Sequence, residues 1–374
     1  MRIIINCSVI RKGGSVQVAL SLLEELKNTE NTYHVFLSEA VDRQIQHEAF
    51  GDNFHFHLFT HSPADLKNRY SVMKQIKKLE HEIGPDLVFT VFGPAYWTPK
   101  TTHISGFADA WCYTPDTIAF KKLRLKDRII LRLVIFIKQF YIKKAHYIIV
   151  ETNIAKKNII KNLGIQDNRI FVVGNTYHKV FLDCEKKERI EYNEFKLLVL
   201  SSFYVHKNLS IINDVIFELK KRTNRKYKFY LTIDNETFKS IFFETDYIEN
   251  LGHQNISNCP AIYNQIDAIF LPTLLETFSA NYPEAMIMQR PILTSDFDFA
   301  HDICGDSALY FNPLSAEDIA QKIILLSENK DLYRLLIKKG NDSLKSFETP
   351  KSRAEKYLSI FNNCVYLNEI NRTI

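Results

Sequence analysis

Two glutamates, Glu276 and Glu284, bracket a short segment that follows an apolar run at residues 268–272. Open α/β sheets bind ligands beyond the carboxyl ends of their strands, so this segment is a candidate binding loop. A carboxylate can accept hydrogen bonds from both members of a hydroxyl pair, as a sugar offers. Spacing alone fits a solvated loop equally well, and the rest of the chain has to decide between the two interpretations.

Two further loops connect an apolar run to a helical run and carry residues suited to binding an anion. Lys207 lies beside a predicted helix start, where its charge would neutralise a diphosphate. Gly13 and Gly14 would allow a ligand to approach the backbone closely. They do not form the GxGxxG fingerprint of nicotinamide-binding domains. A solvated lysine and a simple tight turn are the alternatives.

A basic segment at residues 121–144 combines nine Lys and Arg residues with one acid, Asp127, and many apolar side chains. A basic helix with aromatic residues can lie on an anionic bilayer surface. The alternative is a helix between domains whose basic face is solvated. Nucleic acid is a poor candidate partner, because the chain shows no recognition module and its net charge is only +5.

The elements that position these residues alternate between short apolar strands and amphipathic helices, which predicts a doubly wound α/β fold. In the first half we expect strands at 2–7, 34–38, 55–59, 87–90, 101–105, 146–151 and 169–173, with helices at 15–28, 71–83 and 153–163. We interpret the charged stretch at 183–189 that follows as a linker between domains. In the second half we expect strands at 196–201, 228–233, 247–251, 268–272, 291–295 and 308–311, with helices at 208–221, 284–288, 316–327 and 330–345.

Length and composition indicate a globular protein of two or three domains. The chain has 374 residues, 46% of them hydrophobic and 24% charged. Its six cysteines form no CxxC pair, so we expect reduced thiols in the cytoplasm and neither a disulfide framework nor a structural zinc. The apolar run after Arg2 is too short for a signal peptide, and no run reaches the length of a membrane span.

The second half resembles the family 4 glycosyltransferases of bacterial surface-polysaccharide assembly, which are retaining enzymes of the GT-B fold. The resemblance rests on Lys207 in its loop, 251–254, Tyr263, 267–272, the Glu276–Glu284 spacing and 284–293, and it is strongest over about 196–320. It implies two Rossmann-like domains facing across a cleft. Residues 1–183 would bind the acceptor, with a C-terminal helix at about 352–374 packing back on them. Residues 184–351 would bind the nucleotide-sugar.

The resemblance also implies roles for individual residues. Glu276 would face the donor sugar, Lys207 would stabilise the leaving diphosphate, and Glu284 would hold the ribose diol. The remaining donor contacts would come from Phe278, Ser279, Gly252, Gln254 and Gly14. His103 and Asp109 are the candidate acceptor-binding residues, although His103 also fits a satisfied histidine of a strand.

Two positions depart from the family pattern. Ser279 replaces the usual Gly, which is a mild change if the contact is through the backbone. Ser202 replaces the usual Arg five residues before Lys207, so one of two cations at the diphosphate is missing. This leaves room for a catalytically silent nucleotide-binding scaffold of a glycan-assembly complex.

We therefore expect a metal-independent retaining hexosyltransferase that moves a sugar from a nucleotide donor to a glycan or polyprenyl-linked acceptor. UDP is the commonest donor nucleotide of such families, with GDP and dTDP as alternatives, and no cofactor is expected. The enzyme would work in the cytoplasm, with peripheral contact to the inner face of the plasma membrane through 121–144. A sugar-nucleotide epimerase, which also uses two Rossmann domains, is a further alternative.

Overall fold

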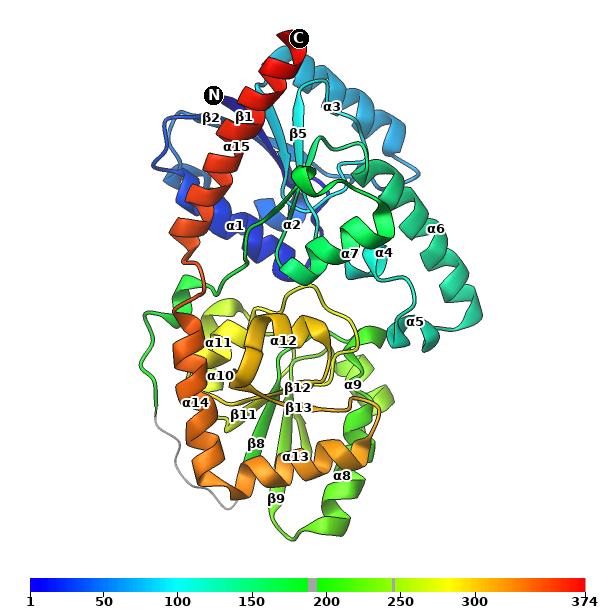
Figure 1. The fold of residues 1–374 in the computed structure, drawn as a ribbon, viewed down its shortest axis with the longest axis vertical. Coiled ribbons are helices and arrows are strands. Elements are labelled where there is room, and N and C mark those ends of the chain that lie inside the picture. Colours follow the sequence, from blue (N-terminus) through cyan, green and yellow to red (C-terminus); the bar gives the residue numbers. More distant parts are fainter. Residues whose placement is uncertain (188–193, 244–245, 374) are drawn as a thin grey trace. The chain divides into compact units, whose positions relative to one another are not determined.

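A computed structural model describes residues 1–187, 194–243 and 246–373 of the chain (Figure 1). It divides the chain into two compact units. Unit 1 comprises Met1–Pro115, Leu125–Asn175 and Glu348–Ile374, and unit 2 comprises Asp116–Arg124 and Thr176–Phe347. This grouping differs from a division at residue 183, because the second unit begins at Thr176 and also takes in a segment of the first half. Of the predicted linker at 183–189, the last two residues lie outside the described part.

Unit 1 is built on a seven-stranded parallel sheet with the order β3-β2-β1-β4-β5-β6-β7. The apolar β1 is buried on both faces, as the strands of parallel sheets are. The order changes direction between β1 and β4. The strands are β1 (Arg2–Asn6), β2 (Thr32–Ser38), β3 (Phe54–Phe59), β4 (Leu87–Thr90), β5 (Thr102–Gly106), β6 (Tyr147–Val150) and β7 (Ile170–Val172).

Helices of unit 1 cover this sheet. They are α1 (Gly14–Leu26), α2 (Glu39–Asp42), η1 (His47–Ala49), α3 (Arg69–Ile83), α4 (Ala110–Tyr113), α6 (Leu125–Ile142), α7 (Asn153–Leu163), η2 (Asp167–Arg169) and α15 (Pro350–Thr373). The helices α1 and α15 lie side by side over the sheet (Figure 1). Their buried apolar residues belong to one core cluster. In α6, by contrast, Ile142 is the one residue classed as buried. Within the described residues, no helix has the length and apolar content needed to cross a membrane.

Unit 2 is built on a six-stranded parallel sheet with the order β10-β9-β8-β11-β12-β13. Its first strand in the sequence, β8, lies between β9 and β11. The order therefore changes direction between β8 and β11, which makes this the topological switch point of the sheet. The strands are β8 (Glu194–Val199), β9 (Lys226–Leu231), β10 (Ile248–Asn250), β11 (Ala268–Leu271), β12 (Ile292–Ser295) and β13 (Ala308–Phe311).

Two apolar clusters cover the two faces of the second sheet. Along β11, Ala268 and Phe270 belong to the cluster that includes α8 and α13, whereas Ile269 and Leu271 belong to the cluster that includes α10, α11 and α12. This alternation follows from the two-residue period of a strand. The helices are α5 (Ile118–Lys121), η3 (Lys179–Phe181), η4 (Val205–Lys207), α8 (Ile211–Arg222), α9 (Asn235–Ile241), η5 (Ile256–Asn258), α10 (Cys259–Tyr263), α11 (Asn281–Ile287), α12 (Asp298–Cys304), η6 (Gly305–Ser307), α13 (Ala316–Glu328) and α14 (Lys330–Leu344).

Candidate functional site

Two loops meet at the switch point of the second sheet. One follows β8 and contains η4, and the other joins β11 to α11. Their backbones are hydrogen-bonded to each other, because Leu274 N–H donates to the carbonyl oxygen of His206 at 2.7 Å. The hydroxyl of Thr273 donates to the same oxygen at 3.2 Å. The distance between the two loops is therefore fixed by the backbone as well as by side chains.

Lys207 and Glu276 form an ion pair across these two loops. The two side chains are 20% and 16% exposed, so the pair is largely shielded from water. Lys207 ends η4 and Glu276 follows β11, so each reaches the pair from the carboxyl end of its own strand. The structure thus brings together the two residues predicted to be catalytic, although they lie far apart in the sequence.

The residue after Lys207 is held by a contact that the sequence did not reveal. Asn208 is buried and adopts a left-handed backbone conformation with φ of 56°. Its amide donates to the carbonyl oxygen of Pro313 at 2.9 Å. Lys122 Nζ donates to its side-chain oxygen at 2.7 Å. The sequence placed Lys122 in the basic segment only, because nothing local signals that 116–124 belongs to unit 2.

Glu284 lies in α11 and is 4% exposed. Burial raises the pKa of its carboxyl to about 7, and the hydrogen bond from the Tyr263 hydroxyl, at 3.4 Å, opposes this shift. Tyr263 is itself fully buried in α10, and its carbonyl oxygen accepts from Arg290 Nε at 2.9 Å. The second glutamate of the segment is therefore enclosed, whereas the first forms an ion pair.

The other predicted donor-binding residues occupy loops at the carboxyl edge of the same sheet. Phe278 and Ser279 lie between β11 and α11, and the ring of Phe278 packs against Phe347. Gly252 and Gln254 follow β10, two strands away from β8. Gly252 has φ of 68°, which favours glycine, and a Cβ there would meet open space. The Gln254 side chain donates to the carbonyl oxygen of Leu251 at 2.6 Å.

The predicted residues of unit 1 do not all come together. Gly14 begins α1 directly after Gly13, whose φ is 76°. Asp109 lies beyond the carboxyl end of β5, where it accepts from Trp111 N–H at 3.2 Å and pairs with Lys138 Nζ at 2.5 Å.

His103 lies instead at the amino end of β5. It is 2% exposed, and its Nε2 lies 3.1 Å from the Thr90 hydroxyl. Burial lowers the pKa of His103 to about 3, with a further contribution from His146. This position fits the structural interpretation of His103 better than contact with an acceptor.

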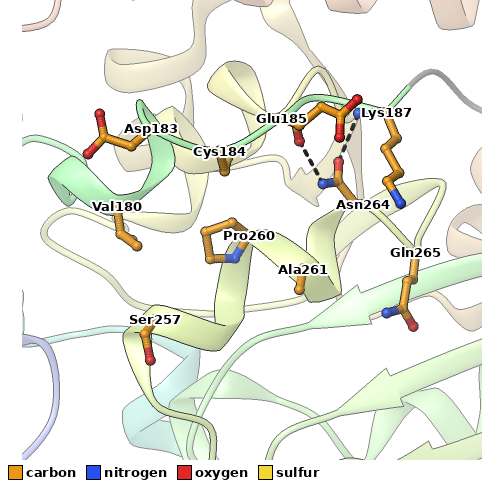
Figure 2. Close-up of a pocket in the computed structure, with 10 residues that line it drawn as sticks. All are labelled: Val180, Asp183, Cys184, Glu185, Lys187, Ser257, Pro260, Ala261, Asn264 and Gln265. Carbon is orange, nitrogen blue, oxygen red and sulfur yellow. Dashed lines mark hydrogen bonds between the residues drawn. The ribbon is translucent and has the colours of Figure 1, made fainter.

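A pocket of about 470 Å³ in unit 2 is lined by other residues (Figure 2). It is formed by η3 and the segment that follows it, by η5, and by α10 with the two residues after it. Asn264 joins the end of α10 to the segment opposite it, accepting from Lys187 N–H at 3.1 Å and donating to the Glu185 carbonyl oxygen at 2.8 Å. The residues that line it are Val180, Asp183, Cys184, Glu185, Lys187, Ser257, Pro260, Ala261, Asn264 and Gln265. No residue predicted to be functional is among them.

The outer surface of α6 is apolar and basic. Its exposed large apolar residues are Leu125, Ile129, Ile130, Leu133, Val134, Phe136, Ile137 and Phe140. Soluble surfaces seldom carry so many apolar side chains on one helix, and such patches mark interaction sites. The helix is held to unit 1 by Lys138, which pairs with Asp109, and by Gln139, which donates to the Cys112 carbonyl oxygen at 2.7 Å.

Comparison with known proteins agrees with this architecture. Residues 194–329 match the family described as glycosyl transferases group 1. O-antigen chain mannosyltransferase RfbU of Salmonella typhimurium is 22% identical over 186 residues, which are 48% of this chain and 50% of that protein. The chain thus aligns with about half the length of this curated relative.

Solved structures resemble the protein over almost its whole length. WaaG, a glycosyltransferase involved in lipopolysaccharide biosynthesis, matches with a TM-score of 0.72 at 13% identity, covering 96% of this chain and 99% of that one. HepE of Anabaena in complex with UDP and glucose matches with a TM-score of 0.70 at 13% identity, over 96% and 99%. The chain therefore has the GT-B fold and contains a glycosyl transferases group 1 domain at residues 194–329.

Proposed function

We propose that the protein is a retaining glycosyltransferase that moves a sugar from a nucleotide-sugar to a glycan or lipid-linked acceptor during surface-polysaccharide assembly. The observation that carries the proposal is the Lys207–Glu276 pair at the switch point, with Glu284 in the following helix. The group 1 domain and the names of RfbU and WaaG support the reaction class and the setting.

The proposed chemistry divides the donor between three side chains. Glu276 accepts hydrogen bonds from the sugar hydroxyls, Lys207 stabilises the negative charge that develops on the leaving diphosphate, and Glu284 accepts from the ribose diol. Backbone N–H groups at Phe278 and Ser279 face the sugar and phosphates. A positive charge held in place before the reaction contributes most when the leaving group departs, because no reorganisation is then needed.

The donor nucleotide in this proposal is UDP, with GDP and dTDP as alternatives. HepE, which has the same fold, was solved with UDP and glucose. Gly252 and Gln254 would meet the base, because they lie at the edge of the sheet that carries Lys207. Gly14 and Asp109 of unit 1 would contribute to phosphate and acceptor binding. Retention proceeds through an oxocarbenium-like state in which the leaving diphosphate accepts the proton of the acceptor hydroxyl.

The proposal also includes peripheral contact with the cytoplasmic face of an anionic membrane. The apolar and basic surface of α6 supports it, because apolar side chains can enter the lipid interface while Lys and Arg meet the headgroups. A polyprenyl-linked acceptor would lie at that interface. Asp109, the proposed acceptor residue, pairs with Lys138 of the same helix.

The test uses the purified full chain. A thermal-shift panel with UDP, GDP and dTDP identifies the nucleotide, and release of that nucleotide from matching sugar donors is then measured with and without a glycan acceptor. We expect release that depends on the acceptor. Nucleotide binding without any transfer would contradict the enzymatic proposal and support the silent scaffold that Ser202 suggests. Conversion of the donor without an acceptor would indicate an epimerase or hydrolase, which the comparisons do not favour.

A further inference from the structure

In the structure, Lys207 and Glu276 form an ion pair with each other. The proposed function gives them different parts of the donor to bind. A diphosphate that approaches Lys207 must compete with the Glu276 carboxylate. The competition is strong, because the pair is only 20% and 16% exposed and water screens it weakly. A ligand that binds to Lys207 therefore has to replace Glu276 as its ionic partner.

The exchange differs between a nucleotide-sugar and a nucleoside diphosphate. The intact donor gives both residues of the ion pair a new partner, since its phosphates reach Lys207 and its sugar hydroxyls donate to Glu276. The free diphosphate gives a new partner to Lys207 only. It leaves the Glu276 carboxylate without its cation and next to another negative charge, which is unfavourable at a largely buried position.

The loop backbone that carries Glu276 is anchored beside Lys207. Leu274 and Thr273, which precede Glu276, are hydrogen-bonded to the carbonyl oxygen of His206, which directly precedes Lys207. The two charged residues are thus brought together by the backbone of their loops. The Glu276 carboxylate therefore stays within reach of a phosphate that Lys207 binds.

We propose that Glu276 is a specificity-determining residue that weakens the binding of free nucleoside diphosphate by competing for Lys207. The site then holds the intact donor and releases the diphosphate product after transfer. This inference rests on the proposed function, and it adds a role for Glu276 beyond contact with the sugar.

The test compares wild type with Glu276→Gln by titration calorimetry, using whichever of UDP, GDP and dTDP stabilises the wild type. Glutamine keeps the size and removes the charge, so we expect the variant to bind the diphosphate about tenfold more tightly, as relief of a charge repulsion allows. Sugar transfer should fall at the same time. Glu249→Gln is the matched control, because Glu249 on β10 forms an ion pair with Lys228 on β9 of the same unit.

Equal or weaker diphosphate binding by Glu276→Gln, in a variant that keeps its thermal transition, would overturn the inference. The pair would then only tie the two loops together. If the variant fails to fold, Glu276→Asp gives a second measurement, with intermediate tightening expected because the shorter carboxylate pairs less well. Failure of the proposed function looks different: neither wild type nor variant would bind any of the three nucleotides or transfer a sugar.

Discussion

Under the proposed function, Lys207 supplies the positive charge at the diphosphate, since Ser202 in the same loop carries no charge. We expect Lys207→Met to lower kcat, because the variant loses about 2–4 kcal/mol of transition-state stabilisation, the range for one preorganised contact. The measurement is the rate of nucleotide release with saturating donor and acceptor. Lys228→Met, which removes a lysine paired with Glu249, serves as the control. An unchanged kcat in Lys207→Met would remove Lys207 from the diphosphate.

Glu284 gives the protein a pH dependence whose sign follows from its burial. Its pKa is raised from 4.5 to about 7, so the folded state holds a proton that the unfolded state releases. The stability that this provides is complete below pH 4.5 and is lost as the pH rises through about 7.

We therefore expect Glu284→Gln to be more stable relative to wild type at pH 8 than at pH 5. The stability difference between variant and wild type should change by at most about 3 kcal/mol between the two pH values, at about 1.4 kcal/mol per pKa unit. Chemical denaturation of both proteins at the two pH values measures it, and the difference between the proteins cancels the other titrating groups. A difference that does not change with pH would show that Glu284 is ionised in the folded protein.

Among the elements, the short helix α5 has a role that its length does not suggest. It brings Lys122 to the side chain of Asn208, directly after Lys207. We expect Lys122→Met to leave a buried acceptor without its donor, which costs about 1–3 kcal/mol of unfolding free energy. Because Lys207 would also lose its fixed position, kcat should fall several-fold with little change in KM for the donor.

Denaturation and steady-state kinetics with an acceptor analogue that carries no lipid measure the two effects of Lys122→Met. Lys126→Met, an exposed lysine at the start of α6, is the control for loss of charge. If Lys126→Met had the same effect as Lys122→Met, general electrostatics rather than the contact with Asn208 would be responsible.

The helix α6 exposes its apolar side chains instead of burying them, and a bilayer interface would bury them. Leu133 and Phe136 are 61% and 69% exposed. We expect Leu133→Ser with Phe136→Ser to reduce flotation with vesicles of phosphatidylcholine and phosphatidylglycerol by tenfold or more, since each side chain contributes about 1.5–3 kcal/mol when buried. Phe217→Ser in unit 2, also at an exposed aromatic residue, should float as wild type does. Equal flotation of all three proteins would leave α6 a structural helix.

At the scale of the whole molecule, the last helix of the chain completes the core of the unit that contains its first strand. Phe361 of α15 is fully buried, and its ring lies 4.9 Å from that of Phe89 in β4. Arg353 fixes the start of the helix by donating to Asn175 at 2.6 Å and to Ser21 at 3.0 Å.

We expect Phe361→Ala to lower the unfolding free energy of unit 1 by about 3–5 kcal/mol, because it leaves a cavity in a packed core. Denaturation followed by circular dichroism measures the loss. Tyr366→Ala on the exposed side of the same helix is the control. A small effect of Phe361→Ala would mean that α15 does not belong to the core of unit 1.

Local patterns were enough to predict the strands and most helices. Apolar runs such as Ile3–Ile5 are buried on both faces, and the 3.6-residue period of α1 faces the core, because both patterns depend only on neighbouring residues. Sequence also placed Lys207 and Glu276 in loops after strands. The grouping of the structure differs from a division at residue 183, because a chain that crosses from one unit to the other and back leaves no local signal.

The sequence by itself therefore determined the elements, their α/β order and the residue types available for chemistry. Only the tertiary structure decided which of these residues meet. Lys207 and Glu276 are 69 positions apart, and Lys122 and Asn208 are 86 apart. Their contacts depend on β8 and β11 becoming neighbours and on α5 packing against η4. Such pairings arise when distant segments bury their apolar faces together, and the sequence near each residue carries no record of them.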